Sequence, residues 1–476
     1  MTAPDRFDFR APRVPLADLG ATHLIAIGGA GMSAVARVLM ARGIVVSGSD
    51  AKDSRTLQSL RDAGAHTCVG HEPAHVDGAE TVVISSAIRD DNVELVQARA
   101  RGLRVLHRSQ ALAALTADRQ VAAVAGANGK TTTTSMLVTA LDAAGLDPSF
   151  AAGGEIASLG TNARWGQGEA FVVEADESDG SFVVYHPQVA IVTNVQPDHL
   201  DYYGTFARVQ EAYAEFVETL SPTGLLVACA DDEGSAVLAQ AATPRTLTYG
   251  MSPGADVRVL QWTPADLGTT ATLRDIDGTI RDLRVPAPGA HNVLNAAAAY
   301  TAAVHGYGAD PDAVLRGLAH FSGARRRFEV IGRAAGVTVV DDYAHNAGKV
   351  QAVVGAAAAI AHGRGARVTV LFQPHLYSRT RDFAEGFATG LAQADRVGVL
   401  DIYGAREDPM PGVTSDLIGD RLRALGVQDT RIGGDRQALV DWATSGVVPG
   451  DLLLLVGAGD VTELGPGVLA RLGVSP

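Results

Sequence analysis

Residues 121–134 read VAAVAGANGKTTTT, an apolar run followed by a glycine-rich turn and a run of threonines. The apolar run predicts a buried strand beginning near Gln120, and the threonines predict the start of a helix. Glycines let backbone N–H groups converge on phosphate oxygens, and the helix N-terminus adds the positive end of its dipole. Lys130 would place a charge on the β- and γ-phosphates, and Thr131 would offer a hydroxyl to Mg²⁺. The stretch therefore predicts a nucleotide triphosphate site in an α/β domain.

The loop is a short form of the phosphate-binding pattern. The full pattern has glycine where this chain has Val124, so the loop reads GxxGKTT. The alternative is a tight strand–helix turn that happens to carry a lysine. Because the chain has only three lysines, Lys52, Lys130 and Lys349, finding one here favours phosphate binding. The predicted ATP contacts in the loop are Gly126, Ala127, Asn128, Gly129, Lys130, Thr131 and Thr132.

Two further strand ends carry the residues that a magnesium nucleotide site needs. Residues 171–179, FVVEADESD, end a strand in carboxylates, and residues 191–201, IVTNVQPDHLD, end another in a histidine–aspartate cluster. Ligands bind beyond the carboxyl ends of strands in an open parallel sheet, so the three turns should face one crevice. Alone, Glu174 or His199 would be a helix-cap acid or a satisfied polar residue. Their shared position after strands favours metal ligation together with Thr131.

The whole chain alternates short apolar runs with helical patterns, which is typical of doubly wound parallel sheets. New series of strands begin near residues 22, 120 and 337. At about 150 residues per domain, a chain of 476 residues predicts three domains. We expect an α/β protein with a Rossmann-like N-terminal domain (1–118), a P-loop-type ATP-binding central domain (119–322) and a Rossmann-like C-terminal domain (323–476). Residues 256–285 alternate polar and apolar side chains around a turn at 275–278, which predicts appended antiparallel strands.

Composition excludes several classes of partner. The chain has 39 basic and 53 acidic residues, a net charge of −14, so it has no electrostatic footprint for nucleic acid or anionic membranes. No apolar run approaches the roughly 18 residues of a spanning helix, and the first 18 residues do not resemble a signal peptide. Two cysteines match no metal or redox spacing. We expect a cytoplasmic protein without membrane insertion, and a monomer or weak homodimer.

The first domain carries an incomplete dinucleotide fingerprint. Residues 26–31 read AIGGAG after a predicted strand, and Asp50 follows nineteen residues after Gly31. With Ala26 in place of the first glycine, this is nearly GxGxxG followed by a ribose-binding acid. An NAD-dependent dehydrogenase would explain this motif, but it leaves the lysine loop and both clusters after strands unexplained.

Taken together, the motifs resemble those of the Mur ligases of peptidoglycan synthesis. The resemblance rests on GKTTT, EADESDGS and TNVQPDHLD, and on further segments in the family's order. Those segments are residues 27–33 (IGGAGMS), 85–88 (SSAI), 291–295 (HNVLN), 325–329 (RRRFE), 341–345 (DDYAH), 372–375 (FQPH), 378–380 (SRT) and 457–460 (GAGD). They cover nearly the whole chain.

The resemblance implies a reaction and its substrates. It implies ATP-dependent joining of L-alanine to the lactyl carboxylate of UDP-N-acetylmuramate through an acyl phosphate, with ATP and Mg²⁺ bound. It reassigns the first domain from NAD to a UDP-sugar, whose diphosphate would lie on Gly28, Gly29, Ala30, Gly31, Met32 and Ser33. Asp50, Ser86 and His71 would lie near the uridine or sugar, although His71 is equally well read as a surface histidine.

The resemblance also implies roles for residues of the other two domains. Asn295 would contact adenine, with a polar cluster at a helix start as the alternative. Arg327 would contact phosphate, and Asp342 would lie on the nucleotide side. His345, His375 and Arg379 would surround the amino acid and the acyl phosphate, since arginine pairs with carboxylates in a bidentate manner. Lys130, His199, His345 and Arg379 are the predicted catalytic residues, and closure of the third domain would exclude water.

Two positions depart from the family pattern. The loop has Asn128 where the family usually has histidine, and residues 345–349 read HNAGK where it usually has HHPTE. Asparagine can replace a neutral histidine in hydrogen bonding but does not titrate. These changes leave two alternatives open beside alanine ligation. One is a recycling ligase that adds a pre-formed tripeptide to the same nucleotide, and the other is a non-catalytic UDP-sugar-binding relative.

Overall fold

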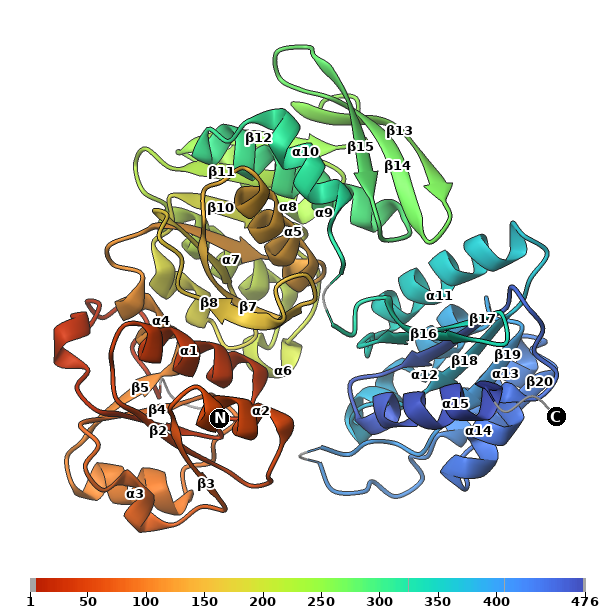
Figure 1. The fold of residues 1–476 in the computed structure, drawn as a ribbon, viewed down its shortest axis with the longest axis horizontal. Coiled ribbons are helices and arrows are strands. Elements are labelled where there is room, and N and C mark those ends of the chain that lie inside the picture. Colours follow the sequence, from red (N-terminus) through yellow and green to blue (C-terminus); the bar gives the residue numbers. More distant parts are fainter. Residues whose placement is uncertain (1–5, 324, 406, 474–476) are drawn as a thin grey trace. The chain divides into compact units, whose positions relative to one another are not determined.

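A computed structural model describes residues 6–323, 325–405 and 407–473. The chain divides into two units (Figure 1). The first comprises residues 1–262, 270–285 and 292–322, and the second comprises residues 263–269, 286–291 and 323–476. Each unit is described by itself.

The first sheet of the first unit is parallel throughout, in the order β3-β2-β1-β4-β5. Its strands are β1 Thr22–Ile25, β2 Val46–Asp50, β3 His66–Val69, β4 Thr81–Ile84 and β5 Arg104–His107. Its helices are α1 Ala30–Ala41, α2 Arg55–Asp62, α3 Val93–Ala100 and α4 Arg108–Leu115. This is the doubly wound order, so the carboxyl ends of all the strands lie along one edge.

The second sheet of this unit has the order β15-β14-β13-β12-β11-β10-β6-β9-β7-β8. Its central strands are β6 Gln120–Ala125, β9 Ala170–Glu174, β10 Val189–Val192, β11 Leu225–Cys229 and β12 Arg245–Gly250, with β7 Ser149–Ile156 and β8 Thr161–Arg164 at one side. Its helices are α5 Lys130–Ala143, α6 Leu200–Tyr203, α7 Phe206–Glu218, α8 Glu233–Ala241, α9 Ala290–Thr301 and α10 Pro311–Ala319. Because β6 pairs in parallel with both β9 and β10, the prediction that their three carboxyl ends are neighbours is confirmed.

The appended strands predicted in residues 256–285 are present. They are β13 Val257–Ala265, β14 Gly268–Arg274 and β15 Ile280–Val285, adjacent in the sheet order and joined by short connections. The turn between β14 and β15 closes where the Asp275 N–H donates to the Thr279 carbonyl oxygen at 2.9 Å. Alternation of exposed and buried side chains along β15 explains why the pattern was visible in the sequence.

The second unit contains the third sheet, in the order β16-β17-β21-β18-β19-β20. Its strands are β16 Glu329–Ala334, β17 Val337–Asp342, β18 Val368–Phe372, β19 Arg396–Val399, β20 Asp429–Ile432 and β21 Leu452–Val456. Its helices are α11 Ala347–His362, α12 Tyr377–Leu391, α13 Asp416–Ala424, α14 Arg436–Thr444 and α15 Gly465–Gly473. All neighbouring strands pair in parallel except β16 and β17, which are antiparallel.

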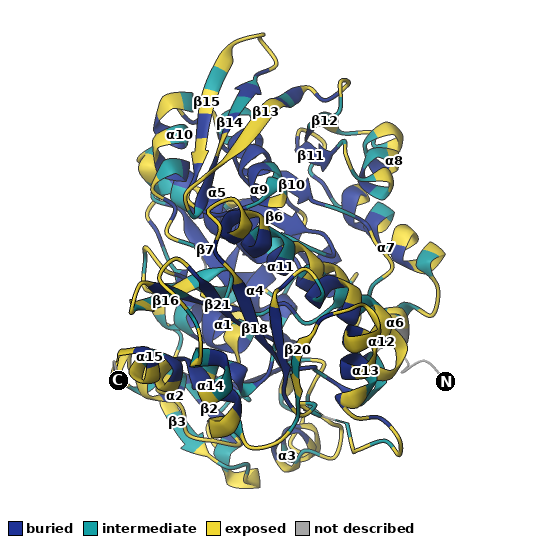
Figure 2. Ribbon diagram, turned by 90° about the vertical axis from the view of Figure 1, so that its right-hand side faces the viewer, coloured by how far each residue is buried: buried dark blue, intermediate teal, exposed yellow. Residues whose placement is uncertain are grey.

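Apolar strands lie beneath amphipathic helices in each unit (Figure 2). β21 reads LLLLV and is buried along its whole length, as expected of a central parallel strand covered on both faces. In the first unit, one apolar cluster joins Leu24 and Val35 of the first sheet layer to Phe171 and Phe216 of the second. Among the described residues, none of the helices combines the length and apolarity needed to cross a bilayer.

The fold class predicted from the sequence is confirmed, with three α/β regions each built on its own sheet. The sheets use residues 22–107, 120–285 and 329–456. The domain limits at residues 118 and 322 stay predictions.

Candidate functional site

The phosphate loop lies between β6 and α5, and side chains that follow β10 hold its backbone in place through hydrogen bonds. The Asn128 N–H donates to Asn194 Oδ1 at 2.9 Å, while Asn194 Nδ2 donates to the Asn128 carbonyl oxygen at 2.9 Å. Thr193 Oγ1 donates to the same carbonyl oxygen at 2.6 Å. The loop is therefore clamped by the end of β10, the neighbouring strand.

Two loop glycines are required by their backbone angles and their surroundings. Gly126 has φ +137° and Gly129 has φ +89°, conformations that L side chains rarely adopt. A Cβ on Gly126 would lie 1.9 Å from Thr193 Oγ1, and one on Gly129 would lie 2.6 Å from Asn295 Oδ1. Gly129 is the N-cap of α5, so the helix begins at Lys130, one residue before the predicted start at the threonines.

Lys130 lies among carboxylates at this strand edge. Its Nζ donates to the Gly126 carbonyl oxygen and to Glu177 Oε1, both at 2.7 Å. Burial would lower the pKa of Lys130, but the Glu177, Asp176 and Glu174 carboxylates together outweigh it and raise the pKa, so the ammonium stays charged. His199 Nε2 lies 3.7 Å from Glu177 Oε1. The structure thus brings together Lys130 and His199, which are 69 positions apart, around Glu177.

Two of the three predicted metal ligands, Thr131 and Glu174, are in contact. Thr131 Oγ1 donates to Glu174 Oε1 at 3.1 Å, and Glu174 Oε2 accepts from the Gly153 N–H at 2.8 Å. No group of three or more His, Cys, Asp or Glu side chains among the described residues is arranged to hold a metal ion alone. One hydroxyl and one carboxylate at a phosphate loop fit Mg²⁺, which protein sites bind through one or two carboxylates plus substrate phosphates. The Glu177 Oε2 atom is buried and has no hydrogen-bond partner among the described residues, so polar capacity remains here for a ligand.

Asn295 lies behind the phosphate loop. It is on α9 and buried, and its Oδ1 accepts from Thr133 Oγ1 at 3.2 Å. Its Nδ2 donates to Asn292 Oδ1 at 3.3 Å. These contacts match the polar cluster that the sequence left as the alternative, while a contact between Asn295 and adenine stays a prediction.

The residues expected to cradle a diphosphate surround the N-terminus of α1. Gly28 and Gly29 precede the helix, and Ala30, Gly31, Met32 and Ser33 form its first turn. The Gly28 N–H donates to Asp50 Oδ2 at 3.0 Å, which ties the turn to the end of β2. Ala26 has φ +60°, the conformation that the fingerprint's missing first glycine would adopt without strain. The Met32 side chain is buried in the core, so only its backbone is available to a ligand.

His71 and Ser86 lie at the same edge of the first sheet, each in a polar network. His71 Nδ1 lies 3.0 Å from Ser49 Oγ and 3.1 Å from Glu94 Oε2. His71 is therefore anchored to a buried carboxylate rather than being a solvated loop histidine. Ser86 Oγ donates to Asp179, which also pairs with His107.

The residues predicted in the third domain belong to the second unit. Asp342 ends β17 and is buried, and its carboxylate accepts from the N–H groups of Phe328 and Ala344 at 2.7 and 2.8 Å. Burial raises the pKa of Asp342. The Arg327 guanidinium lies 5.2 Å from the centroid of the Tyr343 ring.

His345, His375 and Arg379 gather near one another. His345 and His375 have ring centroids 6.0 Å apart. His345 Nδ1 lies 2.9 Å from the Tyr343 carbonyl oxygen, so Nδ1 carries the proton and Nε2 keeps its lone pair. Burial, with the nearby charges of Lys349 and Arg379, lowers the pKa of His345 well below its usual value. His345 is therefore neutral at neutral pH.

The departure at Asn346 has a structural reason. Asn346 is the N-cap of α11, where its Oδ1 accepts from the Lys349 N–H at 2.9 Å. Asparagine is among the strongest N-cap residues, so it stabilises the helix start directly after His345.

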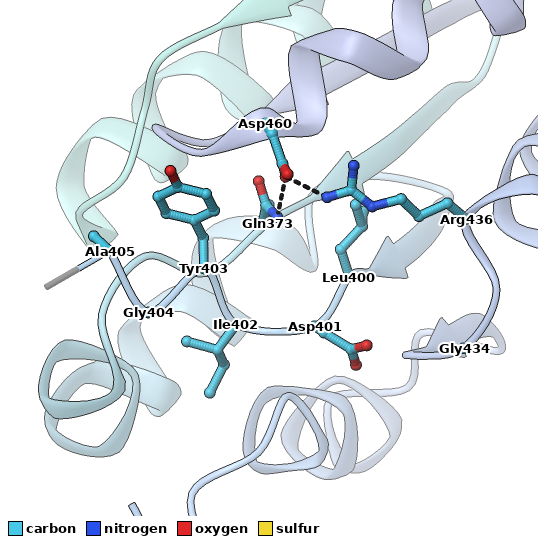
Figure 3. Close-up of a pocket in the computed structure, with 10 residues that line it drawn as sticks. All are labelled: Gln373, Leu400, Asp401, Ile402, Tyr403, Gly404, Ala405, Gly434, Arg436 and Asp460. Atoms are coloured by element: carbon cyan, nitrogen blue, oxygen red, sulfur yellow. Dashed lines mark hydrogen bonds and ion pairs between the residues drawn. The ribbon is translucent and has the colours of Figure 1, made fainter. Parts of the chain in front are cut away.

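A pocket of about 440 Å³, lined by Tyr403, Arg436 and Asp460 among others, was not found from the sequence (Figure 3). It opens at the carboxyl edge of the third sheet, and the Tyr403 ring on its wall stacks on His375 with centroids 5.9 Å apart. Asp460 Oδ1 accepts a hydrogen bond from Gln373 Nε2 at 2.7 Å and also pairs with the Arg436 guanidinium. The lining combines acidic and basic side chains with an aromatic wall, a combination that suits a small polar ligand.

Three family descriptions match this chain in order. "Mur ligase family, catalytic domain" matches residues 21–120, "Mur ligase middle domain" matches residues 124–303, and "Mur ligase, glutamate ligase domain" matches residues 326–459. The UDP-N-acetylmuramate–L-alanine ligase of Kineococcus radiotolerans is 56% identical over 96% of this chain and 97% of its own length. The chain belongs to the Mur ligase family.

Other Mur ligases agree in sequence and in fold. The UDP-N-acetylmuramate–L-alanine ligase of Paenarthrobacter aurescens is 49% identical over 96% of this chain and 98% of its own. The solved UDP-N-acetylmuramate-alanine ligase of Thermotoga maritima has a TM-score of 0.81 at 28% identity, covering 95% of this chain and 98% of that chain. A murein peptide ligase from Psychrobacter arcticus, with a TM-score of 0.71 at 23% identity over 96% of this chain and 99% of that one, shares the fold.

Several residues of this Mur ligase site were not assigned from the sequence. Glu177, Thr193 and Asn194 stand inside quoted motifs, and their position after strands was the available signal. Asn162 gave no such signal, yet its Nδ2 on β8 donates to the Ala30 carbonyl oxygen at 2.7 Å and to Ser33 Oγ at 3.1 Å. Only the packing of β8 against α1 makes this contact.

Proposed function

We propose that the protein is the ligase that joins L-alanine to the lactyl carboxylate of UDP-N-acetylmuramate at the expense of ATP, in peptidoglycan precursor synthesis. The observation that carries the proposal is the assembly of Lys130, Thr131, Glu174 and His199 at one strand edge. The chain that carries these residues is 56% identical, over nearly its whole length, to the UDP-N-acetylmuramate–L-alanine ligase of Kineococcus radiotolerans.

The reaction has two balanced steps. A lactyl carboxylate oxygen attacks the γ-phosphorus of ATP, and the bond between the γ-phosphorus and the bridging β-phosphate oxygen breaks. The products are an acyl phosphate and ADP. The alanine amine then attacks the acyl carbon, inorganic phosphate leaves, and the amine loses its proton. Both reactants of the first step are anions, so the first task of the protein is to reduce their repulsion.

Residues of the first unit are placed for the phosphoryl step. The loop N–H groups and the N-terminus of α5 would bind the β- and γ-phosphates, and Lys130 would exchange Glu177 for phosphate oxygens. Thr131, Glu174 and His199 would hold Mg²⁺, which supplies charge neutralisation between the γ-phosphate and the carboxylate. Gly28–Ser33, Asp50, His71 and Ser86 would hold the UDP-sugar.

Residues of the second unit would serve the amine step. The Arg379 guanidinium can bind alanine's carboxylate through two parallel hydrogen bonds. The Nε2 lone pair of neutral His345 can accept a proton from the amine as the amide forms. His375 would complete the amino-acid site, and Arg327 and Asp342 would serve the nucleotide.

The direct test is phosphate release from ATP in the presence of UDP-N-acetylmuramate, comparing alanine, glycine, serine and the tripeptide as acceptors. We expect turnover with alanine, dependent on Mg²⁺. The absence of turnover with every acceptor would refute the ligase proposal, and a preference for the tripeptide would select a recycling ligase instead. Because its substrates are cytoplasmic nucleotides, we place the enzyme in the cytoplasm. We expect it to act as a monomer or weak homodimer.

A further inference from the structure

The proposed UDP-sugar site is short of positive charge. None of the residues in the turn Gly28–Ser33 has a cationic side chain, while the diphosphate that it would hold is an anion. The N-terminus of α1 contributes the equivalent of only about half a charge. A cation from another element would therefore add to the binding of a diphosphate at this turn.

Arg108 is the arginine that the fold brings to the turn. It is the first residue of α4, directly after β5, so it starts at the same carboxyl edge of the first sheet as Gly28. A Cβ built on Gly31 would lie 3.0 Å from Arg108 Nη1 and 3.7 Å from its Cζ. The guanidinium therefore lies against the first helical turn of α1, and any side chain at position 31 would displace it.

The other end of the guanidinium fork is fixed by Asp176. Arg108 Nη2 donates to Asp176 Oδ2 at 2.6 Å, and the arginine side chain is 21% exposed. Burial alone would lower the pKa of Arg108, but its interactions with Asp176, Tyr185 and Asp179 together outweigh this and raise the pKa. Guanidinium has five N–H donors, so one bond to Asp176 leaves donors for a second anion.

We propose that Arg108 is a binding residue for the diphosphate of the UDP-sugar, held in position by Asp176. The Nη1 edge, which lies against Gly31, contacts the diphosphate, while Nη2 stays on the carboxylate. The inference rests on the proposed function, because it takes a UDP-sugar as the ligand of this turn. It adds a residue that neither the fingerprint nor the family segments pointed to.

The same contact links the two ligand sites of the first unit. Asp176 lies between Glu174, the last residue of β9, which contacts Thr131, and Glu177, which holds Lys130. Alternate acids of this segment therefore face the phosphate loop and the first sheet. Arg108 stands where the diphosphate turn meets this segment.

The test compares ligands with and without the diphosphate. Affinities for UDP and for uridine are measured in the full chain by competition against UDP-N-acetylmuramate, for the unaltered protein, Arg108→Gln and Arg108→Lys. The matched control is Arg42→Gln, because Arg42 follows the opposite end of α1, is 25% exposed and pairs with Asp118 at 3.2 Å.

Loss of charge-assisted hydrogen bonds predicts that Arg108→Gln weakens UDP about tenfold or more. Its uridine affinity should be unchanged, and Arg42→Gln should change neither. Arg108→Lys should fall between the unaltered protein and Arg108→Gln, since an ammonium cannot span both anions as a fork does. In turnover, Arg108→Gln should raise KM for UDP-N-acetylmuramate more than KM for ATP.

An unchanged ratio of UDP to uridine affinity in folded Arg108→Gln would overturn the inference, and so would an equal loss in Arg42→Gln. If Arg108→Gln does not fold, Arg108→Lys decides, and UDP affinity equal to that of the unaltered protein would overturn it. Failure of the unaltered protein to bind UDP would overturn the proposed function as well, so the two failures are distinguishable.

Discussion

Removing the Lys130 charge tests the phosphate loop, provided that its effect on folding is separated from its effect on catalysis. Lys130 Nζ and Glu177 Oε1 are 2.7 Å apart, and their side chains are 14% and 3% exposed. At an effective dielectric of about 20, the Coulomb attraction at that distance is about 6 kcal/mol before the cost of desolvation. Removing one partner of such a buried pair costs about 3–5 kcal/mol, because the other charge is left buried alone.

The informative comparison is therefore Lys130→Met against the double variant Lys130→Met/Glu177→Gln. Methionine keeps the apolar stem, and glutamine removes the stranded charge. We expect the single variant to lose about 3 kcal/mol in the free energy of unfolding, and the double variant to recover most of it. In both variants kcat should be about 10²–10³ lower than in the unaltered protein, because both lack the positioned charge at the transferring phosphoryl group.

The assays are urea unfolding, ATP-dependent phosphate release with UDP-N-acetylmuramate and alanine, and calorimetric titration with UDP-N-acetylmuramate. Affinity for the UDP-sugar should stay within about threefold of the unaltered protein, since that ligand binds at a different sheet. Turnover by the double variant within threefold of the unaltered protein would refute the role of Lys130. A loss of UDP-sugar affinity as large as the loss of turnover would contradict the assignment of these ligands to separate sites.

Two further predictions concern acids of the first unit. Glu174→Gln should raise the Mg²⁺ concentration for half-maximal phosphate release about tenfold or more, because the carboxylate beside Thr131 loses its charge. The same variant should bind UDP-N-acetylmuramate with unchanged affinity. An unchanged Mg²⁺ requirement would exclude Glu174 as a ligand. Burial alone would raise the pKa of Glu94, but hydrogen bonds from Ser49 and His75, with the His23 imidazole 3.8 Å away, lower it to about 2. Because this is below the unfolded value, Glu94 contributes about 3 kcal/mol of stability above pH 5 that disappears as the pH falls towards 2. Urea unfolding between pH 6 and 3 should show a shallower decline in Glu94→Gln, and parallel declines would contradict the shifted pKa.

The central strands could be predicted because their sequences satisfy both faces of a buried sheet. β6 and β9 begin and end where the apolar runs predicted, since helices cover both faces and no polar alternation interrupts them. β7 and β8 were not predicted. β7 has two glycines in its second half, and β8 is a short polar strand at the sheet edge. Their strand conformation depends on pairing with each other and with β9, which no local pattern records.

The candidate site divides in the same way. Residues that stand directly after strands, such as Lys130, Glu174 and His199, could be found because parallel strands deliver their carboxyl ends to one edge. The roles of Glu177 and Arg108 could not be found, because each depends on a partner from another strand or sheet. The pocket beside Tyr403 is formed by turns after several strands and likewise has no counterpart in any single segment.

The sequence alone predicted the α/β class and the family, which are confirmed, and it also predicted the phosphate loop and the residues of each ligand site. These predictions follow from local periodicity and from short motifs with fixed spacing. Tertiary structure decided how those residues are held. It paired Lys130 with Glu177, clamped Asn128 with Asn194, anchored His71 on Glu94 and set Arg108 against Gly31. Each of these contacts joins segments that are distant in sequence, and the free energy of a buried charge depends on which partner the fold places within hydrogen-bonding distance.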